Sequence, residues 1–419
     1  MIHRGIATFT LDEGKCPKWL FERLVRLGRG MLEIIIDEYG PEEFIKRIAD
    51  PVWFQALGTV LAFDWNSSGL TTILTAALKE AIRGQEKDLG VFIAGGKGKT
   101  SRKTPEEIEN WGDKLNLPQE QTKSLVYNSR LSAKVDSALV QDGFQIYHHA
   151  FFFSKKGSWA VVQQGMNTVN QTARRYHWYS DKTQINADET QINADNKTQI
   201  NADETQINAD NKTQTKTSAF SFVCEPHRGI VSELKQKFVL NLVSRQSGKT
   251  RDLSVQLVQA GYHSLIKDIQ ILRKHSSPIH QMAVLKINNR QITFLNLENE
   301  EFKFHPVILE DFSQSRYLEK ILMKVCDIKP SGYETLLATA GMGPKTMRAL
   351  ALVSEIIYGA KPSYEDPARY SFAHGGKDAT PYPVDRQTYD QTIEMMKRAV
   401  AKIKLDFSEK RRIIQNLEK

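Results

Sequence analysis

Two apolar runs joined by a short polar turn place the strongest constraint on how this chain can fold. Residues 143–154 (GFQIYHHAFFFS) and 159–165 (WAVVQQG) are rich in aromatic and β-branched side chains, and the turn KKGS separates them. Such runs around a glycine-containing turn predict an antiparallel β-hairpin. The middle of the chain therefore contains β-structure.

Other segments in the middle of the chain extend this β-structure. Residues 91–96 (VFIAGG) are typical of a short buried strand, and residues 218–224 (SAFSFVC) predict another. Residues 283–287 (AVLKI) and 292–297 (ITFLNL) flank Asn288 and Asn289, which predicts a second hairpin. Residues 104–107 (TPEE) have the pattern of a helix capping box. The middle is therefore predicted to be mixed α/β.

The first 84 residues have the pattern of helices with clear boundaries. Gly40 and Pro41 supply a helix end and the start of the next helix, Asp50 precedes Pro51 in the same way, and Ser68 can cap a further helix. Apolar residues recur every three or four positions in the first helix: Leu20, Leu24, Leu27, Met31 and Ile35. This pattern predicts a helical bundle or a helical lid.

These patterns together predict an α+β protein with three regions and one insertion. Residues 1–84 form the N-terminal helical region, and residues 85–180 with 218–310 form a mixed α/β central domain. Residues 311–419 form a C-terminal helical domain.

A repeat separates the two halves of the central domain. The units TQINADE and TQINADNK alternate within residues 181–217, with one isoleucine per unit. This is too little apolar surface to bury between neighbouring repeats, so we expect a disordered polar insertion. A β-solenoid built on the four isoleucines is the alternative.

The charge favours an anionic partner. The chain has 57 Lys and Arg against 49 Asp and Glu, a net charge of +8, and the remainder without the repeat carries +11. A basic protein tends to associate with phosphate polymers, which makes DNA or RNA the expected partner.

Cysteine spacing and hydropathy exclude several other classes of protein. Cys16, Cys224 and Cys326 form no CxxC pair, which excludes a disulfide framework or a four-cysteine metal cluster. Because the chain has no apolar run of membrane-spanning length and no visible secretory signal, we expect a cytoplasmic protein with no membrane partner.

Residues 336–357 (LLATAGMGPKTMRALALVSEII) carry the sharpest motif. Two helical patterns flank Gly341 and Gly343, which is the spacing of a helix-hairpin-helix motif. Amides at the start of the second helix can bind a phosphate, and Lys345 and Arg348 add positive charge. The alternative is a helix pair whose glycines only allow close packing.

The segment GMGPKT also resembles the hairpin of DNA glycosylases of the endonuclease III type. That resemblance implies a lyase in which Lys345 forms a Schiff base with the help of an Asp, here Asp366 or Asp385. It is a second functional hypothesis beside simple binding of the backbone.

Residues 94–100 (AGGKGKT) imitate a phosphate-binding loop. The first glycine of the GxxxxGK[ST] pattern would fall at Ile93, so the loop is not of the Walker type. A glycine-rich turn bearing Lys97 and Lys99 can still form an anion-binding nest. An exposed basic loop is the alternative.

The central region holds residue types that hydrolytic sites use. We expect catalytic side chains among a set of acids, amides and histidines: Asp136, Asp142, His149, Gln163 and Glu225. Asp142, His149 and Glu225 are the candidate ligands for Mg²⁺ or Mn²⁺ that would activate water. Because adjacent strand residues face opposite sides, His148 and His149 cannot share one site. A polar sheet with hydrogen-bonded histidines is the alternative.

Arg174 and Arg175 lie in the segment ARRYHW, next to aromatic side chains. This composition suits phosphate contact and base stacking, so both arginines are candidate nucleic-acid contacts.

Several long segments resemble the prokaryotic family known as domain of unknown function 763. The resemblance covers the chain apart from the repeat, and it rests on these segments: FDWNSSGLTT, AGGKGKTSRKTPEEI, QDGFQIYHH, WAVVQQGMN, ARRYHWYS, EPHRGI, GMGPKTMRALALVSEIIYG, SFAHGGKD and PYPVDRQTYD. It implies no activity. The residues themselves favour a nucleic-acid-processing protein, such as a metal-dependent nuclease in DNA repair, with a lyase or a non-enzymatic binding module as alternatives.

Overall fold

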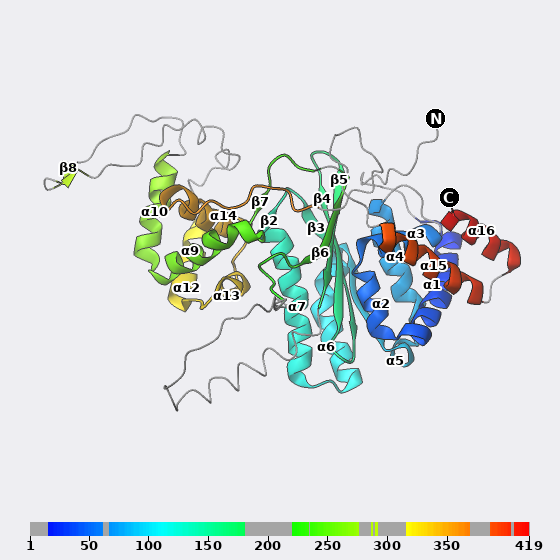
Figure 1. Cartoon of the computed structure of the whole chain (residues 1–419). Coiled ribbons are helices and arrows are strands. Elements are labelled where there is room, and N and C mark those ends of the chain that lie inside the picture. Colours follow the sequence, from blue (N-terminus) through cyan, green and yellow to red (C-terminus); the bar gives the residue numbers. More distant parts are fainter. Residues whose placement is uncertain are drawn as a thin grey trace, which may run out of the picture.

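The chain folds around a central antiparallel sheet with helices on both of its faces, as the computed structural model shows (Figure 1). The α+β class predicted from the sequence is therefore confirmed. The structure describes residues 16–61, 67–180, 220–233, 235–275, 286–287, 290–291, 316–368, 386–403 and 406–418. The repeat and Asp385 lie outside the described residues, so the expectations for them stay untested.

The boundaries that the sequence predicts at Gly40 and Asp50 are confirmed, whereas Ser68, expected as a helix cap, lies inside a helix that starts at Ser67. Gly40, with φ 83°, follows the first helix, and the carboxylate of Asp50 caps the third by accepting bonds from the amides of Val52 and Trp53. These five helices are α1 (Lys18–Tyr39), α2 (Pro41–Ile48), α3 (Pro51–Val60), α4 (Ser67–Ala81) and α5 (Glu86–Leu89).

The sheet has five strands in the order β1-β3-β4-β5-β6, and every neighbouring pair is antiparallel. The predicted hairpin of β3 and β4 is confirmed, with Phe153 opposite Trp159 next to the turn. The strands are β1 (Val91–Lys97), β3 (Gln145–Ser154), β4 (Trp159–Asn167), β5 (Thr172–Tyr179) and β6 (His227–Ser232).

One prediction in this region is wrong. None of the described residues 220–224 of the segment SAFSFVC is in a strand, and the last strand of the sheet begins instead at His227. Phe222 is buried against Trp159 and Trp178, so the apolar run serves packing beside the sheet. The ARRYHW segment, for which the sequence predicts only nucleic-acid contacts, lies in strand β5.

Helices cover the second face of the sheet as well. The short helix η1 (Gly98–Lys103) leads from β1 into α6 (Thr104–Leu115), and α7 (Gln119–Ala138) follows. The capping box predicted at α6 is wrong, because the Glu107 carboxylate accepts bonds from the Lys79 ammonium and the Gly95 amide instead. Side chains on the two faces of the sheet thus belong to two different cores.

Further helices extend the core on the α7 side (Figure 1). They are α9 (Gly248–Gln259), α10 (Tyr262–His275), α12 (Arg316–Ile328), α13 (Tyr333–Ala338) and α14 (Pro344–Leu352), the last continued by the π-helical turn η3 (Val353–Ile357). Small elements complete this side: β2 (Val140–Gln141), β7 (Leu240–Asn241), η2 (Arg245–Ser247), β8 (Lys286–Ile287) and β9 (Arg290–Gln291). The last two strands pair within the region where a second hairpin is predicted.

The last two helices, α15 (Arg386–Lys402) and α16 (Phe407–Glu418), lie across the sheet from α9 to α14 (Figure 1). They contact α1 and α3, and Met396 and Val400 join the core of the N-terminal helices. The segment expected as one C-terminal domain therefore supplies helices to both sides of the sheet. No described helix has the length and apolar character that crossing a membrane requires.

We expect Met396→Ala to lower the free energy of unfolding by about 2–4 kcal/mol, because the fully buried side chain would leave a cavity between α15 and the N-terminal helices. Urea denaturation followed by circular dichroism measures the change. Arg398→Ala, on the exposed face of the same helix, serves as the control and should stay within about 0.5 kcal/mol of the parent protein. Equal effects of the two substitutions would contradict this packing.

Candidate functional site

Asp136 is the centre of a buried polar network between α7 and the sheet. Its carboxylate, which has no exposed surface, accepts hydrogen bonds from Gln163 Nε2, from Trp178 Nε1 at 2.9 Å and from His227 Nε2. Because these donors come from β4, β5 and β6, the carboxylate ties one helix to three strands. The predicted catalytic residues Asp136 and Gln163 are thus in direct contact.

His149 joins the same network through both ring nitrogens. Its Nδ1 lies 2.9 Å from Gln163 Oε1, and its Nε2 lies 2.9 Å from the hydroxyl of Ser129. Since an amide oxygen can only accept, Nδ1 is the donor and Nε2 accepts from Ser129. Burial lowers the pKa of His149, so the neutral ring that these two bonds require is favoured.

Asp142 belongs to a separate cluster around Arg174. The guanidinium of Arg174 donates to Asp142 at 2.9 Å and to both oxygens of Asp366, at 2.9 and 2.7 Å. Asp142 also accepts from the Tyr176 hydroxyl at 2.7 Å and from the Phe144 amide at 3.1 Å. Burial raises the pKa of Asp142 and opposes the charge of Arg174, but the two carboxylates outweigh that penalty and raise the pKa of Arg174.

The three predicted metal ligands do not share a site. Asp142 binds Arg174, both nitrogens of His149 are engaged, and the Glu225 carboxylate lies 3.4 Å from Arg245 Nε. Within the part of the chain that the structure describes, no three His, Cys, Asp or Glu side chains are grouped to hold a metal ion.

Glu225 and His227 line a pocket of about 190 Å³ where the Asp136 network reaches the surface. Its walls also include Lys235, Asn241 of β7 and residues 363–368. Glu225 has a φ of 47°, a conformation that is uncommon outside glycine, and its amide donates to Val243 O at 2.7 Å. The sequence places both Glu225 and His227 in the central group of acids, amides and histidines, although only Glu225 was chosen as a catalytic residue. Lys235 and Asn241 were not expected there, since neither belongs to a recognisable motif.

Arg174 and Arg175 are fully buried and point to opposite faces of β5. The phosphate contact expected of them requires exposed guanidinium groups. Arg175 instead donates to Thr71 Oγ1 at 3.2 Å and to Gln55 Oε1 at 3.1 Å, and burial lowers its pKa to about 9. Both faces of the sheet are covered, so charged strand residues become internal hydrogen-bond donors.

A second polar layer lies on the α4 side of the sheet. His148 lies directly opposite Gln164 in the strand register, and Gln164 lies opposite Arg175. His148 Nε2 is 3.1 Å from Thr75 Oγ1 of α4, and Gln164 Nε2 donates to Ser68 O at 3.0 Å. Burial lowers the pKa of His148 to about 3, so its ring is neutral. As expected from strand geometry, His148 and His149 serve different layers.

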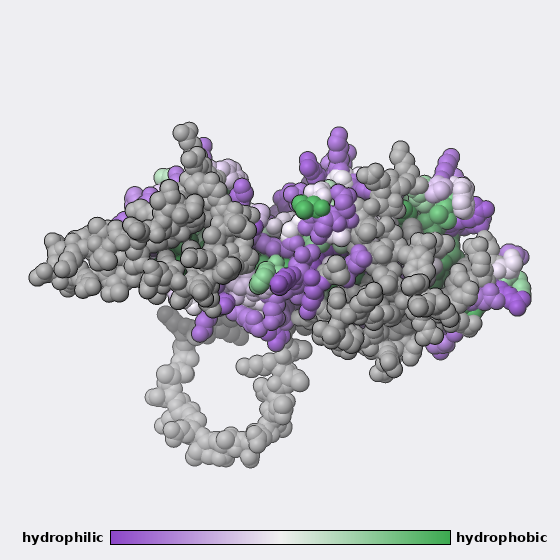
Figure 2. All heavy atoms as spheres, turned by 90° about the horizontal axis from the view of Figure 1, so that it is seen from above, coloured by the Kyte–Doolittle hydropathy of each residue, from purple (hydrophilic) through white to green (hydrophobic). Residues whose placement is uncertain are grey.

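Lys97 and Lys99 are exposed at the end of β1 and in η1. The Lys97 ammonium lies 5.9 Å from the centre of the Tyr147 ring. The amide of Gly95 cannot bind an anion, because its N–H already donates to the Glu107 carboxylate at 2.8 Å. Figure 2, seen from above, shows mostly hydrophilic surface over the described middle part of the molecule, where the sheet ends.

The glycine-containing turn predicted around Gly341 joins α13 to α14. Gly341 has a φ of 96°, and a side chain there would overlap Ile321, so glycine is required at this position. Lys345 is exposed in the first turn of α14. Arg348 Nε donates to Gln141 Oε1 at 2.6 Å, so this side chain is held against β2 rather than projecting freely. Asp366, one of the two partners that the lyase hypothesis offers Lys345, is bound to Arg174.

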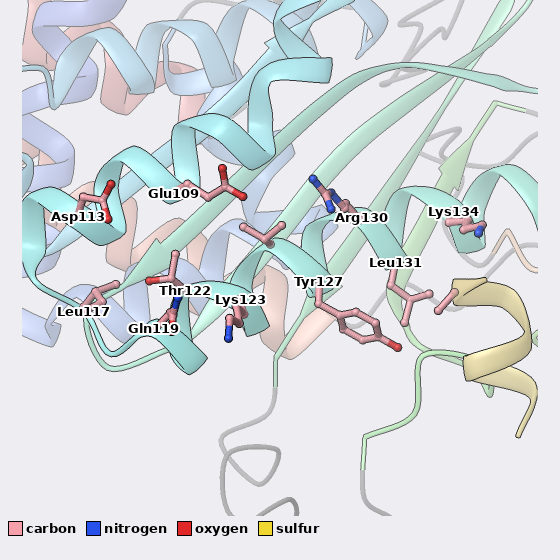
Figure 3. A pocket seen from close by; sticks show the side chains of 12 residues that line it. Glu109, Asp113, Leu117, Gln119, Thr122, Lys123, Tyr127, Arg130, Leu131 and Lys134 are labelled. Carbon is pink, nitrogen blue, oxygen red and sulfur yellow. The ribbon is translucent and has the colours of Figure 1, made fainter. Parts of the chain in front are cut away.

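A larger groove of about 770 Å³ lies along α6 and α7 and reaches Ala338 at the end of α13 (Figure 3). Cationic and aromatic side chains of α7 line it, namely Lys123, Tyr127, Arg130 and Lys134. Glu109 and Asp113 of α6 line the groove as well. No sequence pattern marks this groove, because its walls come from separate helices.

The groove is tied to α13 and to the turn that follows it. The Tyr127 hydroxyl donates to Glu334 Oε1 at 2.8 Å, and the Lys134 ammonium donates to Thr339 O at 2.8 Å. Burial lowers the pKa of Lys134. The basic face of α7 and the Gly341 turn are therefore neighbours.

Fold and site together define an α+β protein with a polar interior and a basic, aromatic groove beside a glycine turn. The chain matches the family described as "Protein of unknown function (DUF763)" over residues 5–218 and 211–384, and it belongs to that family. The resemblance noted in the sequence is thus confirmed. Comparison with curated proteins and with solved structures found no match.

Proposed function

We propose that this protein binds nucleic acid in the groove along α7, with the sugar-phosphate backbone held by cations of that helix. The observation that carries the proposal is the groove itself, in which three cations and a partly exposed tyrosine share one helix face beside the Gly341 turn.

Helix geometry aligns these side chains. Lys123, Tyr127, Arg130 and Lys134 are separated by four, three and four residues, which places them on one face of α7. The rise of about 1.5 Å per residue spreads them over roughly 16 Å, enough for several nucleotides. Contacts of this kind hold phosphates without reading bases, and Tyr127 offers a ring on which a base can stack.

The acidic wall sets the direction in which a strand would lie. Glu109 and Asp113 of α6 repel phosphates, so the backbone is favoured on the α7 side and the bases face α6. The exocyclic amino groups of bases can donate to these carboxylates. This arrangement suits a single strand, whose bases are free.

The turn at Gly341 extends the interface as a helix-hairpin-helix motif. α14 begins with Pro344, which has no N–H, so the amides that follow it and the exposed Lys345 side chain can meet one phosphate at the positive end of the helix dipole. Lys134 connects this turn to the groove through its bond to Thr339. The exposed Lys97 and Lys99 add positive charge at the sheet end.

Binding is better supported than the other two hypotheses. Hydrolysis with Mg²⁺ or Mn²⁺ needs reachable ligands, whereas Asp136, His149 and Gln163 are buried and bonded to one another. A lyase needs an acid beside Lys345; of its two candidates, Asp366 is bound to Arg174, and Asp385 lies outside the described residues.

We expect Arg130→Glu to weaken binding of a fluorescent single-stranded oligonucleotide about tenfold and to lower the salt slope of the affinity by about one. Arg130 is exposed in the middle of the cationic face of α7, so its loss removes a phosphate contact with little effect on folding. Fluorescence anisotropy at several salt concentrations, with single-stranded and duplex DNA and RNA, gives both quantities.

Arg398→Glu is the matched control, since it makes the same charge change on α15, outside the groove. It should leave the affinity within about twofold of the parent protein. Equal losses in the two variants, or no binding to any of the probes in dilute buffer, would refute the proposed interface.

A further inference from the structure

The turn between α13 and α14 is bordered by lysines from two different helices. The Lys134 ammonium of α7 donates to Thr339 O at 2.8 Å, and the Lys324 ammonium of α12 lies 3.5 Å from Ala340 O. Consecutive Cα atoms are only about 3.8 Å apart, so both cations stand beside one short stretch of chain. α14, which follows the turn, contacts both α7 and α12 (Figure 1). The turn is therefore a point where these two helices meet.

α12 presents a second cationic and aromatic face at this turn. Tyr317, Lys320 and Lys324 are separated by three and four residues, which places them on one side of the helix. All three are exposed, and Tyr317 at 63% leaves its ring open to contact. The Tyr317 hydroxyl lies 3.6 Å from the position that a Cβ on Gly341 would occupy, so the face begins at the turn. The exposed Asp327 lies one helical turn beyond Lys324 and marks its far end.

The lysines around the turn have no anionic partner. In the part of the chain that the structure describes, none of the following forms an ion pair: Lys134, Lys320, Lys324 and Lys345. An ammonium group has three donors, so Lys134 and Lys324 keep N–H groups for a phosphate after their contact with the turn. Burial lowers the pKa of Lys134, and an anion beside it would favour the charged form.

We propose that a nucleic-acid strand in the α7 groove continues past the Gly341 turn onto this face of α12, where Lys320 and Lys324 contact phosphates and Tyr317 stacks on a base. The inference rests on the binding proposed for the α7 groove and lengthens that interface. The helical rise gives the α12 face a length of roughly 10 Å, in addition to roughly 16 Å along α7.

The aromatic side chains favour a polynucleotide over an acidic protein segment as the occupant. Either partner would match the charge of the lysines. Only bases supply flat rings that can stack on the Tyr127 and Tyr317 side chains, and each of these tyrosines stands on a cationic helix face.

Fluorescence anisotropy of the full chain with single-stranded oligonucleotides of about 6 and 18 nucleotides tests the inference. We expect the parent protein to bind the long probe more tightly. Lys320→Glu should weaken binding of the long probe about tenfold and leave the short probe, which the α7 groove alone can hold, within about twofold. Lys320 is exposed and forms no hydrogen bond or ion pair with a described residue, so folding should be unaffected.

Tyr317→Ala should weaken binding of the long probe about fivefold through lost stacking, whereas Tyr317→Phe should keep the parent affinity because the ring remains. Lys87→Glu is the matched control, since it makes the same charge change at an exposed position of α5, among the N-terminal helices. It should change the affinity for either probe by no more than about twofold.

Equal affinities of the Lys320→Glu and Lys87→Glu proteins for the long probe, with Arg130→Glu still weakening both probes, would overturn the extension and leave the α7 groove in place. If Arg130→Glu had no effect on either probe, the groove itself would be refuted, and the extension with it. Displacement of the long probe by polyglutamate as readily as by an unlabelled oligonucleotide of equal charge would assign the α12 face to an acidic protein and overturn the proposal as well.

Discussion

Asp366→Ala is expected to lower the free energy of unfolding by about 3–5 kcal/mol. Asp366 and Asp142 together hold the fully buried Arg174 guanidinium, and Asp366 supplies two of its three hydrogen bonds. Its removal leaves a buried cation with half of its compensating charge. The amides of Gln236 and Ala368, which donate to Asp366 at 2.6 and 2.9 Å, also lose their acceptor.

Urea denaturation gives this change, and Glu365→Ala is the neighbouring control. Glu365 is exposed, so its loss should shift the free energy of unfolding by no more than about 0.5 kcal/mol. If the Asp366→Ala protein were as stable as the Glu365→Ala protein, the ion pair of Arg174 with Asp366 would contribute nothing to stability. A second variant, Asp142→Ala, should be destabilised to a similar extent because it removes the other carboxylate.

Asp136→Ala should lower the free energy of unfolding by about 3–5 kcal/mol. Three buried donors, on Gln163, Trp178 and His227, would lose their acceptor, and each unsatisfied donor costs about 1–3 kcal/mol before relaxation. These unsatisfied donors would lie between α7 and three strands, where little water can enter to replace the carboxylate. Near-ultraviolet circular dichroism would report the changed surroundings of Trp178 in the folded variant.

Ser137→Ala is the control for this substitution, because Ser137 is the next residue of α7 and is exposed. It should stay within about 0.5 kcal/mol of the parent protein. Asp136→Asn should fall between the two, since the amide keeps one acceptor oxygen but brings a new donor into the network. A stable Asp136→Ala protein would mean that the network contributes nothing to folding.

Local signals predicted much of the fold. Gly40 with Pro41, and Asp50 with Pro51, mark helix boundaries through their own backbone geometry, so the sequence pattern located them. The β3–β4 hairpin was found because its turn and its apolar runs are adjacent. In contrast, the position of α15 against α1 and α3 depends on contacts between residues hundreds of positions apart, which periodicity does not encode.

The site was harder to predict because a strand covered on both faces does not alternate simply between polar and apolar residues. Arg174, Arg175 and His177 in β5 suggest an exposed strand, yet all three are buried against helices on one face or the other. The set Asp136, His149 and Gln163 was chosen for its chemistry and does meet in space. Asp142 was chosen in the same way and meets Arg174, because only the tertiary fold decides which charges become partners.

The position of α15 has a consequence for folding during translation. The N-terminal helices share their core with Met396 and Val400, which a ribosome adds long after α1 and α3. Until those residues emerge, the nascent chain presents an apolar surface on α1 and α3 to its surroundings. Chaperone capture of stalled chains ending before α15, and release of chains that include it, would be the cellular signature of this late closure.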